Sequence, residues 1–251
     1  MTINEKMMLI GLFLSRFDKK GLEVLGFKRF WEAYNTFALA LGGPPKSINN
    51  YRDEFDAHFP NPRKGWASRP LRPTRKAMME KYADLSLEEF AKVIREVTSS
   101  LGDAEDVASE GESMSFAKRM MTGQSAENYF ETHYKEVSCF KDASLTRTTA
   151  HGCGFDFRLE VDGNPYLAVE VKGLGAINGA FQMTSKEYKV ADYLQDRYFL
   201  YVVRGFETPR PFFTVVRNPL RASLMLEKHE VVSYQTFWSG DVTNDLVSNC
   251  A

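Results

Sequence analysis

Residues 155–172 carry the pattern that most restricts how this chain can fold. Hydrophobic and polar side chains alternate from Phe155 to Val161 and again from Tyr166 to Lys172, which is the period of β-strands. Between the two runs stands Asp162-Gly163-Asn164-Pro165, whose composition is typical of a tight turn. We therefore expect two adjacent antiparallel strands.

Three charged residues stand inside this hairpin. Glu170 and Lys172 are two positions apart on the second strand, so they share one face of the sheet. Pairing across a four-residue turn sets Asp156 near the level of Val171. A bulge or bend in the glycine-flanked segment before Asp156 would bring its carboxylate beside Glu170.

Such a cluster favours one kind of chemistry. Neighbouring carboxylates repel, and their charged forms are stabilised when a hard cation such as Mg²⁺ lies between them. A metal held in this way activates a bound water and neutralises charge on a phosphate, while an adjacent lysine orients or deprotonates the attacking water. The cluster predicts metal-assisted hydrolysis of a phosphodiester. The alternative is alternating charge on a solvated strand face, which also produces Glu-x-Lys.

The rest of the second half predicts an α/β sandwich with a mixed sheet. A helix over residues 116–137 comes first, and a second helix begins at the capping box Thr184-Ser185-Lys186-Glu187. The apolar residues expected to turn this second helix toward the sheet are Tyr188, Ala191, Tyr193 and Leu194. Strands are expected over residues 144–150, 155–161, 166–171, 198–203 and 212–216.

The first hundred residues have the periodicity of helices. We expect helices within residues 4–40, from Lys46 with Ser47 as N-cap, and over 85–98 with a capping box of Ser86 and Glu89. Residues 101–115 are rich in Ser, Gly, Asp and Glu, which is typical of a solvated linker. The chain thus divides into a helical domain at 1–100, an acidic linker at 101–115 and an α/β domain at 116–251.

Basic residues cluster at the end of the helical domain. This cluster, residues 63–81, has a single acid, Glu80, and includes a tryptophan, a composition suited to binding nucleic acid. The alternative is a solvated loop whose cations pair with acids elsewhere. The candidate DNA contacts are Arg63, Lys64, Trp66, Arg69, Arg72, Arg75 and Lys76, with Asn49, Asn50 and Arg52 as weaker candidates.

Composition excludes several classes of protein. The chain has 251 residues, of which 43% are hydrophobic, enough to build a core without crosslinks. No disulfide framework or zinc spacing can be assembled from the three cysteines (Cys139, Cys153, Cys250) and four histidines (His58, His133, His151, His229). The N-terminus lacks a cleavage site, and no run is long enough to span a bilayer. We expect a cytoplasmic protein that does not contact membranes.

Gly154-Phe155-Asp156 followed by Glu170-Val171-Lys172 resembles the PD-(D/E)xK nuclease superfamily. The wider stretch of residues 116–216 looks like the DUF3883 branch of restriction endonuclease-like domains. Phe155 replaces the superfamily's proline before Asp156. Gln182 is followed four positions later by Lys186 rather than by tyrosine, which argues against the exonuclease branches.

The resemblance implies a role for each matching residue. Asp156, Glu170 and the carbonyl of Val171 would ligate Mg²⁺, with Mn²⁺ as a substitute, and Lys172 would position the water. Glu127 would be a supplementary acid, and Gln182 would contact the site from the loop before the next helix.

Together these features predict a Mg²⁺-dependent endonuclease of restriction or phage-defence type. It would act on double-stranded DNA as a homodimer, so that two sites address two strands. Two alternatives stay open: a DNA-binding or scaffold module that keeps this fold without cleavage, and a nuclease of repair or RNA processing.

Overall fold

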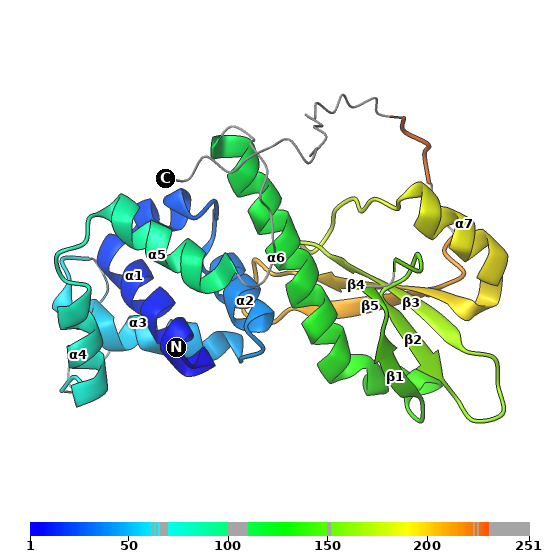
Figure 1. Cartoon of the computed structure of the whole chain (residues 1–251), viewed down its shortest axis with the longest axis horizontal. Coiled ribbons are helices and arrows are strands. Elements are labelled where there is room, and N and C mark those ends of the chain that lie inside the picture. The colour runs from blue at the N-terminus through cyan, green and yellow to red at the C-terminus, as the bar shows by residue number, and fades with distance from the viewer. Residues whose placement is uncertain are drawn as a thin grey trace, which may run out of the picture.

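A computed structural model describes residues 1–61, 63, 65, 70–99, 110–149, 152–222, 224 and 226–230. It joins a bundle of helices to a five-stranded mixed sheet flanked by helices, as the sequence predicts (Figure 1). In this described part of the chain, no helix combines the length and apolarity needed to cross a bilayer.

Five α-helices form the N-terminal bundle. They are α1 (Ile3–Val24), α2 (Phe30–Ala40), α3 (Pro45–Phe55), α4 (Pro73–Lys81) and α5 (Leu87–Ser99), with a 3-10 turn, η1 (Asp56–His58), after α3. The predicted capping box is confirmed, because Ser86 and Glu89 exchange backbone-to-side-chain hydrogen bonds. The prediction of Ser47 as N-cap is wrong: α3 begins two residues earlier, at Pro45, where a helix needs no N–H donor.

The second half follows the predicted order of elements. The long helix α6 (Glu110–His133) precedes the sheet, and the 3-10 turns η2 (Tyr134–Glu136) and η3 (Ser138–Phe140) follow it. The strands are β1 (Ser144–Arg147), β2 (Phe157–Glu160), β3 (Leu167–Gly173), β4 (Tyr198–Arg204) and β5 (Phe212–Arg217). Helix α7 (Ser185–Leu194) and the turn η5 (Gln195–Arg197) connect β3 to β4.

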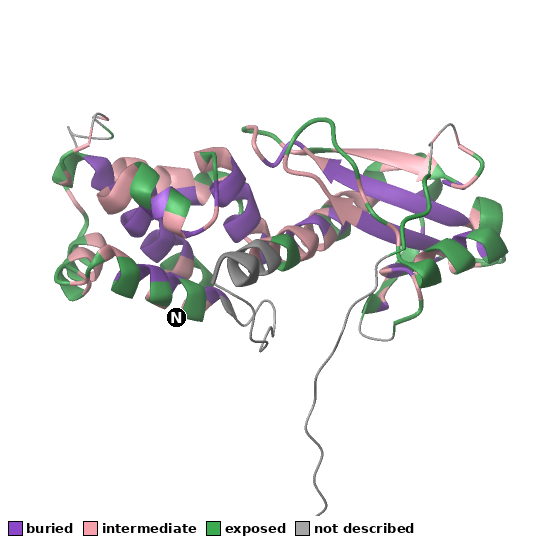
Figure 2. Cartoon of the chain, turned by 90° about the horizontal axis from the view of Figure 1, so that it is seen from above, coloured by how far each residue is buried: buried purple, intermediate pink, exposed green. Residues whose placement is uncertain are grey.

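The five strands lie side by side in chain order. Every neighbouring pair is antiparallel except β3 and β4, which are parallel because α7 crosses over between them. Strand β4 is buried along nearly its whole length, whereas the edge strand β5 is partly exposed (Figure 2).

The two faces of the sheet pack against different helices. Odd-numbered residues of β3, such as Val169, join Phe130 of α6 in one core. Even-numbered Ala168 packs on the other face with Ala191 and Leu194 of α7. The prediction that Tyr188 and Tyr193 also face the sheet is wrong, because they are 50% and 81% exposed. The α7 face of β3 is also the face that carries Glu170 and Lys172.

Helix α6 joins the bundle to the sheet. It begins at Glu110, so residues 110–115 of the predicted linker are helical, and residues 101–109 lie outside the described part. Ser125 of α6 donates a 2.7 Å hydrogen bond to the carbonyl of Thr36 in α2. Asn35 donates to the carbonyls of Phe206 and Thr208 after β4, at 2.6 and 2.8 Å. Buried polar bonds of this kind fix α2 against both α6 and the sheet.

The Phe130 ring is the centre of the core under α6. It is fully buried, and its centroid lies 4.7 Å from that of Phe157 and 4.8 Å from that of Tyr201. We expect Phe130→Ala to lower the free energy of unfolding by about 3–5 kcal/mol in urea denaturation, because it leaves a cavity. Met120→Ala, at an exposed position of the same helix, should change it by less than about 0.5 kcal/mol. Equal effects of the two substitutions would contradict this core.

Candidate functional site

Strand pairing brings Asp156 to the face that carries Glu170 and Lys172. Phe157 of β2 pairs with Val169 of β3, so Asp156 stands one step further, level with Glu170. The predicted level with Val171 is therefore wrong by one residue. The difference matters because a shift of one residue moves a side chain to the other face of the sheet. The carboxylates of Asp156 and Glu170 line one cavity on the α7 side, and the positive φ of Gly154 supplies the bend expected before Asp156.

Asp156 closes the open end of the hairpin. Its backbone N–H donates to the carbonyl of Val169 at 3.0 Å, and its carboxylate Oδ2 accepts from the N–H of Val171 at 2.9 Å. Gly154, two residues earlier, has a φ of +84°, and a Cβ there would lie 2.8 Å from the side chain of Val190. A glycine at this position therefore allows both the turn into Asp156 and the close approach of α7.

Lys172 connects the strand to helix α7. Its Nζ lies 2.6 Å from Oε1 of Glu170 and 2.7 Å from Oε2 of Glu187. Glu187 is held by the predicted capping box, in which its Oε2 accepts from the N–H of Thr184 at 3.2 Å. From the sequence, Glu187 is expected only as a capping residue. The spacing between Lys172 and the helix start gives no sign that the two side chains meet.

Burial and repulsion raise the pKa values of the carboxyl groups. Glu170 is only 4% exposed, and burial followed by the charge of Asp156 raises its pKa to about 8. The pKa of Asp156 is also raised by burial, against the hydrogen bond from Val171. Burial lowers the pKa of Lys172, but Glu170 and Glu187 raise it by more, so this side chain stays an ammonium at neutral pH.

A fourth carboxylate approaches from the other layer. Glu127 of α6 lies 3.1 Å from the guanidinium of Arg147 on β1 and accepts from the hydroxyl of Thr149 at 3.2 Å. Burial, then the charge of Asp156, raises the pKa of Glu127 to about 7. Glu127 thus lies within electrostatic reach of Asp156, as the resemblance implies. Arg147 also pairs with Glu131 at 3.0 Å, and no pattern in the sequence predicts either of its two ion pairs.

The carboxylates open into a cavity of about 210 Å³ between the loop before β2 and the start of α7. Its lining includes Asp156, Glu170, Glu187, Lys186, Thr149 and Thr184, with Gly152–Phe155 from the loop. Gln182, the predicted contact from the loop before α7, is exposed and does not line this cavity.

The donor set suits a hard divalent cation. In the residues that the structure describes, no group of three or more His, Cys, Asp or Glu side chains is arranged to hold a metal ion. Mg²⁺ does not need such a cage, since it is usually bound by one or two carboxylates together with waters and substrate phosphates. Asp156 and Glu170 are carboxylates of this kind, and burial, followed for Glu170 by the charge of Asp156, raises their pKa values, so a cation between them would stabilise their charged forms.

Two predicted DNA contacts have partners inside the helical bundle. The Arg52 side chain is buried, with its guanidinium 3.8 Å from the centre of the Phe30 ring and in ion pairs with Asp18 and Asp56. Arg63 forms ion pairs with the same two aspartates. Acids of other elements therefore already pair with the guanidinium groups of Arg52 and Arg63.

The remaining candidates divide by exposure. The Arg75 side chain is only 15% exposed and pairs with Glu54 at 3.2 Å. Asn49 donates a hydrogen bond to Asp53 at 3.1 Å. Asn50 is half-buried on α3. Arg72 and Lys76 keep 65% and 66% of their side chains exposed. Lys64, Trp66 and Arg69 lie outside the described residues.

One protein family matches the part of the chain that contains the sheet and the candidate site. Residues 125–215 match the family model described as Protein NO VEIN, C-terminal. The matched segment is thus similar to that family from Ser125 in α6 to Val215 in β5, and it contains Glu127, Asp156, Glu170, Lys172 and Glu187. It leaves out the helical bundle. No curated protein and no solved structure matches the chain.

The raised pKa of Glu170 predicts how stability depends on pH. Between its ordinary value of 4.5 and about 8, the folded chain binds a proton that the unfolded chain has lost, so stability falls as pH rises through this window. Glutamine does not titrate, so Glu170→Gln removes this loss. Without metal, the unfolding free energy of Glu170→Gln relative to that of wild type should therefore rise by about 1–2 kcal/mol from pH 6 to pH 8. Urea denaturation at both pH values measures the difference.

Glu160→Gln is the matched control, because Glu160 is half-exposed on β2 and pairs with Arg158. Its unfolding free energy should follow wild type at both pH values. If the unfolding free energy of Glu170→Gln also follows wild type at both pH values, Glu170 is not a buried carboxyl with a raised pKa.

Proposed function

We propose that this chain is a metal-dependent nuclease of the PD-(D/E)xK type that hydrolyses phosphodiester bonds in DNA. The observation that carries the proposal is the placement of Asp156, Glu170 and Lys172 on one face of the sheet, with the lysine bonded to Glu170. The match of residues 125–215 to one family model supports treating the sheet and its carboxylates as one functional unit.

In this proposal Asp156 and Glu170 hold Mg²⁺, with the Val171 carbonyl as the third ligand that the resemblance implies. When bound, Mg²⁺ would supply a water of lowered pKa and charge neutralisation at the phosphate. The chain's own residues would orient the water and the phosphate. Lys172 is an ammonium whose pKa is raised, so it donates hydrogen bonds that orient the attacking water or the phosphate and does not remove a proton.

Glu187 and Arg147 act on the site indirectly. Glu187 holds the Lys172 ammonium from the α7 side, which limits where its remaining hydrogens point. Arg147 neutralises Glu127, so this supplementary acid adds less repulsion to Asp156 than a free carboxylate would. Both effects keep a crowded acidic site folded before a substrate arrives.

The helical bundle would bind the DNA backbone. The exposed cations Arg72 and Lys76 belong to the region of α4, which lies at the end of the bundle away from the sheet (Figure 1). A duplex that contacts both regions would run along the molecule, and each phosphate contact would release counterions. Cutting both strands requires two sites, so we propose a homodimer of restriction or phage-defence type.

One observation favours a second candidate, a DNA-binding module without cleavage. Lys172 has two carboxylate partners and Asp156 has a backbone N–H, so the cluster is stabilised by its own residues. A domain that kept these contacts only for folding would bind DNA and leave it intact.

Cleavage of plasmid DNA separates the two candidates. With Mg²⁺ the wild-type chain should cut supercoiled plasmid or phage DNA, modified or unmodified, and EDTA should stop it. Asp156→Ala and Lys172→Ala should lower the rate by about 100-fold or more, since each removes a charge at the reacting phosphate. Lys92→Ala, at an exposed position of α5, is the matched control and should cut at the wild-type rate.

Binding without cleavage on every substrate, or cleavage that survives in Asp156→Ala, would contradict the nuclease. The first result would favour the non-cleaving module.

A further inference from the structure

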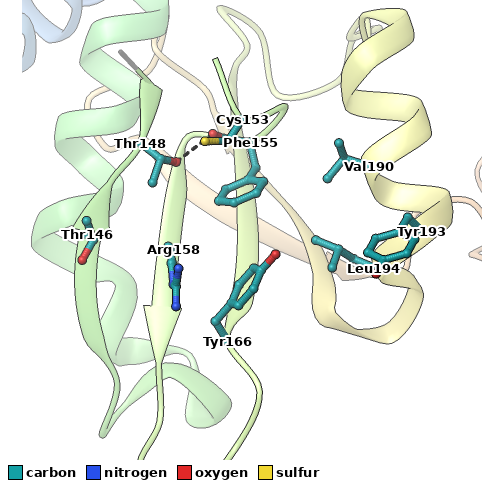
Figure 3. A pocket seen from close by; sticks show the side chains of 9 residues that line it. All are labelled: Thr146, Thr148, Cys153, Phe155, Arg158, Tyr166, Val190, Tyr193 and Leu194. Carbon is teal, nitrogen blue, oxygen red and sulfur yellow. Dashed lines mark hydrogen bonds between the residues drawn. The ribbon is translucent and has the colours of Figure 1, made fainter. Parts of the chain in front are cut away.

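A second, larger cavity lies beside the carboxylate cavity. Its volume is about 600 Å³, within the range of small-ligand sites. It opens between the α7 face of the first strands and helix α7, as Figure 3 shows. The lining residues are Thr146, Thr148, Cys153, Phe155, Arg158, Tyr166, Val190, Tyr193 and Leu194.

The two cavities are neighbours on either side of the loop before β2. Cys153 and Phe155 line both of them. Phe155 is immediately followed by Asp156, whose carboxylate belongs to the smaller cavity. A molecule that places a phosphate among the carboxylates therefore has its next group beside the larger cavity.

The walls of the larger cavity suit a flat aromatic group. The rings of Phe155 and Tyr166 lie 6.1 Å apart at an interplanar angle of 32°, and Val190 and Leu194 come from α7 on the opposite side (Figure 3). Tyr193 stands at the rim and is 81% exposed. A planar ligand can stack on such rings with little loss of entropy, because aromatic side chains have few rotatable bonds.

The charge of the lining selects an anionic ligand. Among the residues that the structure describes, Arg158 is the one charged residue that lines the cavity, and its guanidinium lies 4.5 Å from the centre of the Tyr166 ring. Arg197 approaches the same ring at 5.7 Å. Arg158 pairs with Glu160 at 2.8 Å, but both side chains are about half-exposed, and such surface pairs are weak enough to exchange for a phosphate.

We propose that this cavity is a nucleobase subsite. It takes one unpaired base of the substrate strand next to the scissile phosphate, with Tyr193 and Tyr166 stacking on the base and Arg158 contacting its phosphate. The inference rests on the proposed function, since the phosphodiester in the smaller cavity is what brings a base to this place. A purely apolar peptide would contact the rings and make no use of the Arg158 guanidinium, whereas a nucleotide contacts both.

Fluorescence anisotropy with Ca²⁺ in place of Mg²⁺ tests the subsite apart from cleavage, because a cation at the carboxylates lets the phosphate approach them while the catalytic metal is left out. Two labelled single-stranded oligonucleotides are compared, a 12-residue oligothymidylate and the same strand with its central bases replaced by abasic sites. Wild type should bind the base-containing strand about 10-fold more tightly, in the range of base–aromatic stacking. Tyr193→Ala should abolish this preference and leave the affinity for the abasic strand unchanged.

Tyr188→Ala is the matched control, because Tyr188 is an exposed tyrosine of the same helix that does not line the cavity. It should keep the wild-type preference. The inference is overturned if wild type binds both strands equally or binds neither. It is equally overturned if Tyr193→Ala keeps the preference, or if Tyr193→Ala converts a dimer to a monomer in light scattering without changing DNA binding.

Plasmid cleavage by the same proteins separates this inference from the proposed function. Base preference without metal-dependent cleavage overturns the nuclease and supports the subsite. Cleavage without base preference supports the nuclease and overturns the subsite.

Discussion

The ammonium group of Lys172 lies between two carboxylates from different layers of the sandwich, Glu170 on β3 and Glu187 on α7. This contact allows acidic groups to be buried on the inner face of the sheet. Burial raises the pKa values of Glu170 and Asp156, and the charge of Lys172 opposes part of that rise. The same contact ties the start of α7 to the strand, so the cavity that holds the carboxylates and the neighbouring aromatic cavity are walled by one helix.

Local patterns predicted most of this fold. Alternation located all five strands, and two capping boxes located the starts of α5 and α7, because these depend on residues close in sequence. The pattern also placed Glu170 and Lys172 on one face. The pairing of Asp156 with Glu170 was missed by one residue, since register depends on how both strands pack on their helices and not on the turn alone.

Contacts between distant residues could not be predicted from the sequence. Glu187 and Arg147 meet the site only because α7 and β1 fold beside it. In the helical bundle, a count of basic residues indicated DNA binding, but Asp18 and Asp56 neutralise Arg63 from other elements. A charge count records the cations of a segment and says nothing about acids that the fold brings to them, so only Arg72 and Lys76 keep their exposure among the described candidates.

Binding of Mn²⁺, which can replace Mg²⁺ at oxygen ligands, tests the central claim most directly. In a titration followed by the electron paramagnetic resonance signal of free Mn²⁺, wild type at pH 8 should bind one ion per chain. The double variant Asp156→Asn with Glu170→Gln should bind none there, and wild type should bind more weakly at pH 6, where protons compete for Glu170. If the double variant binds Mn²⁺ as wild type does, these carboxylates do not form a metal site.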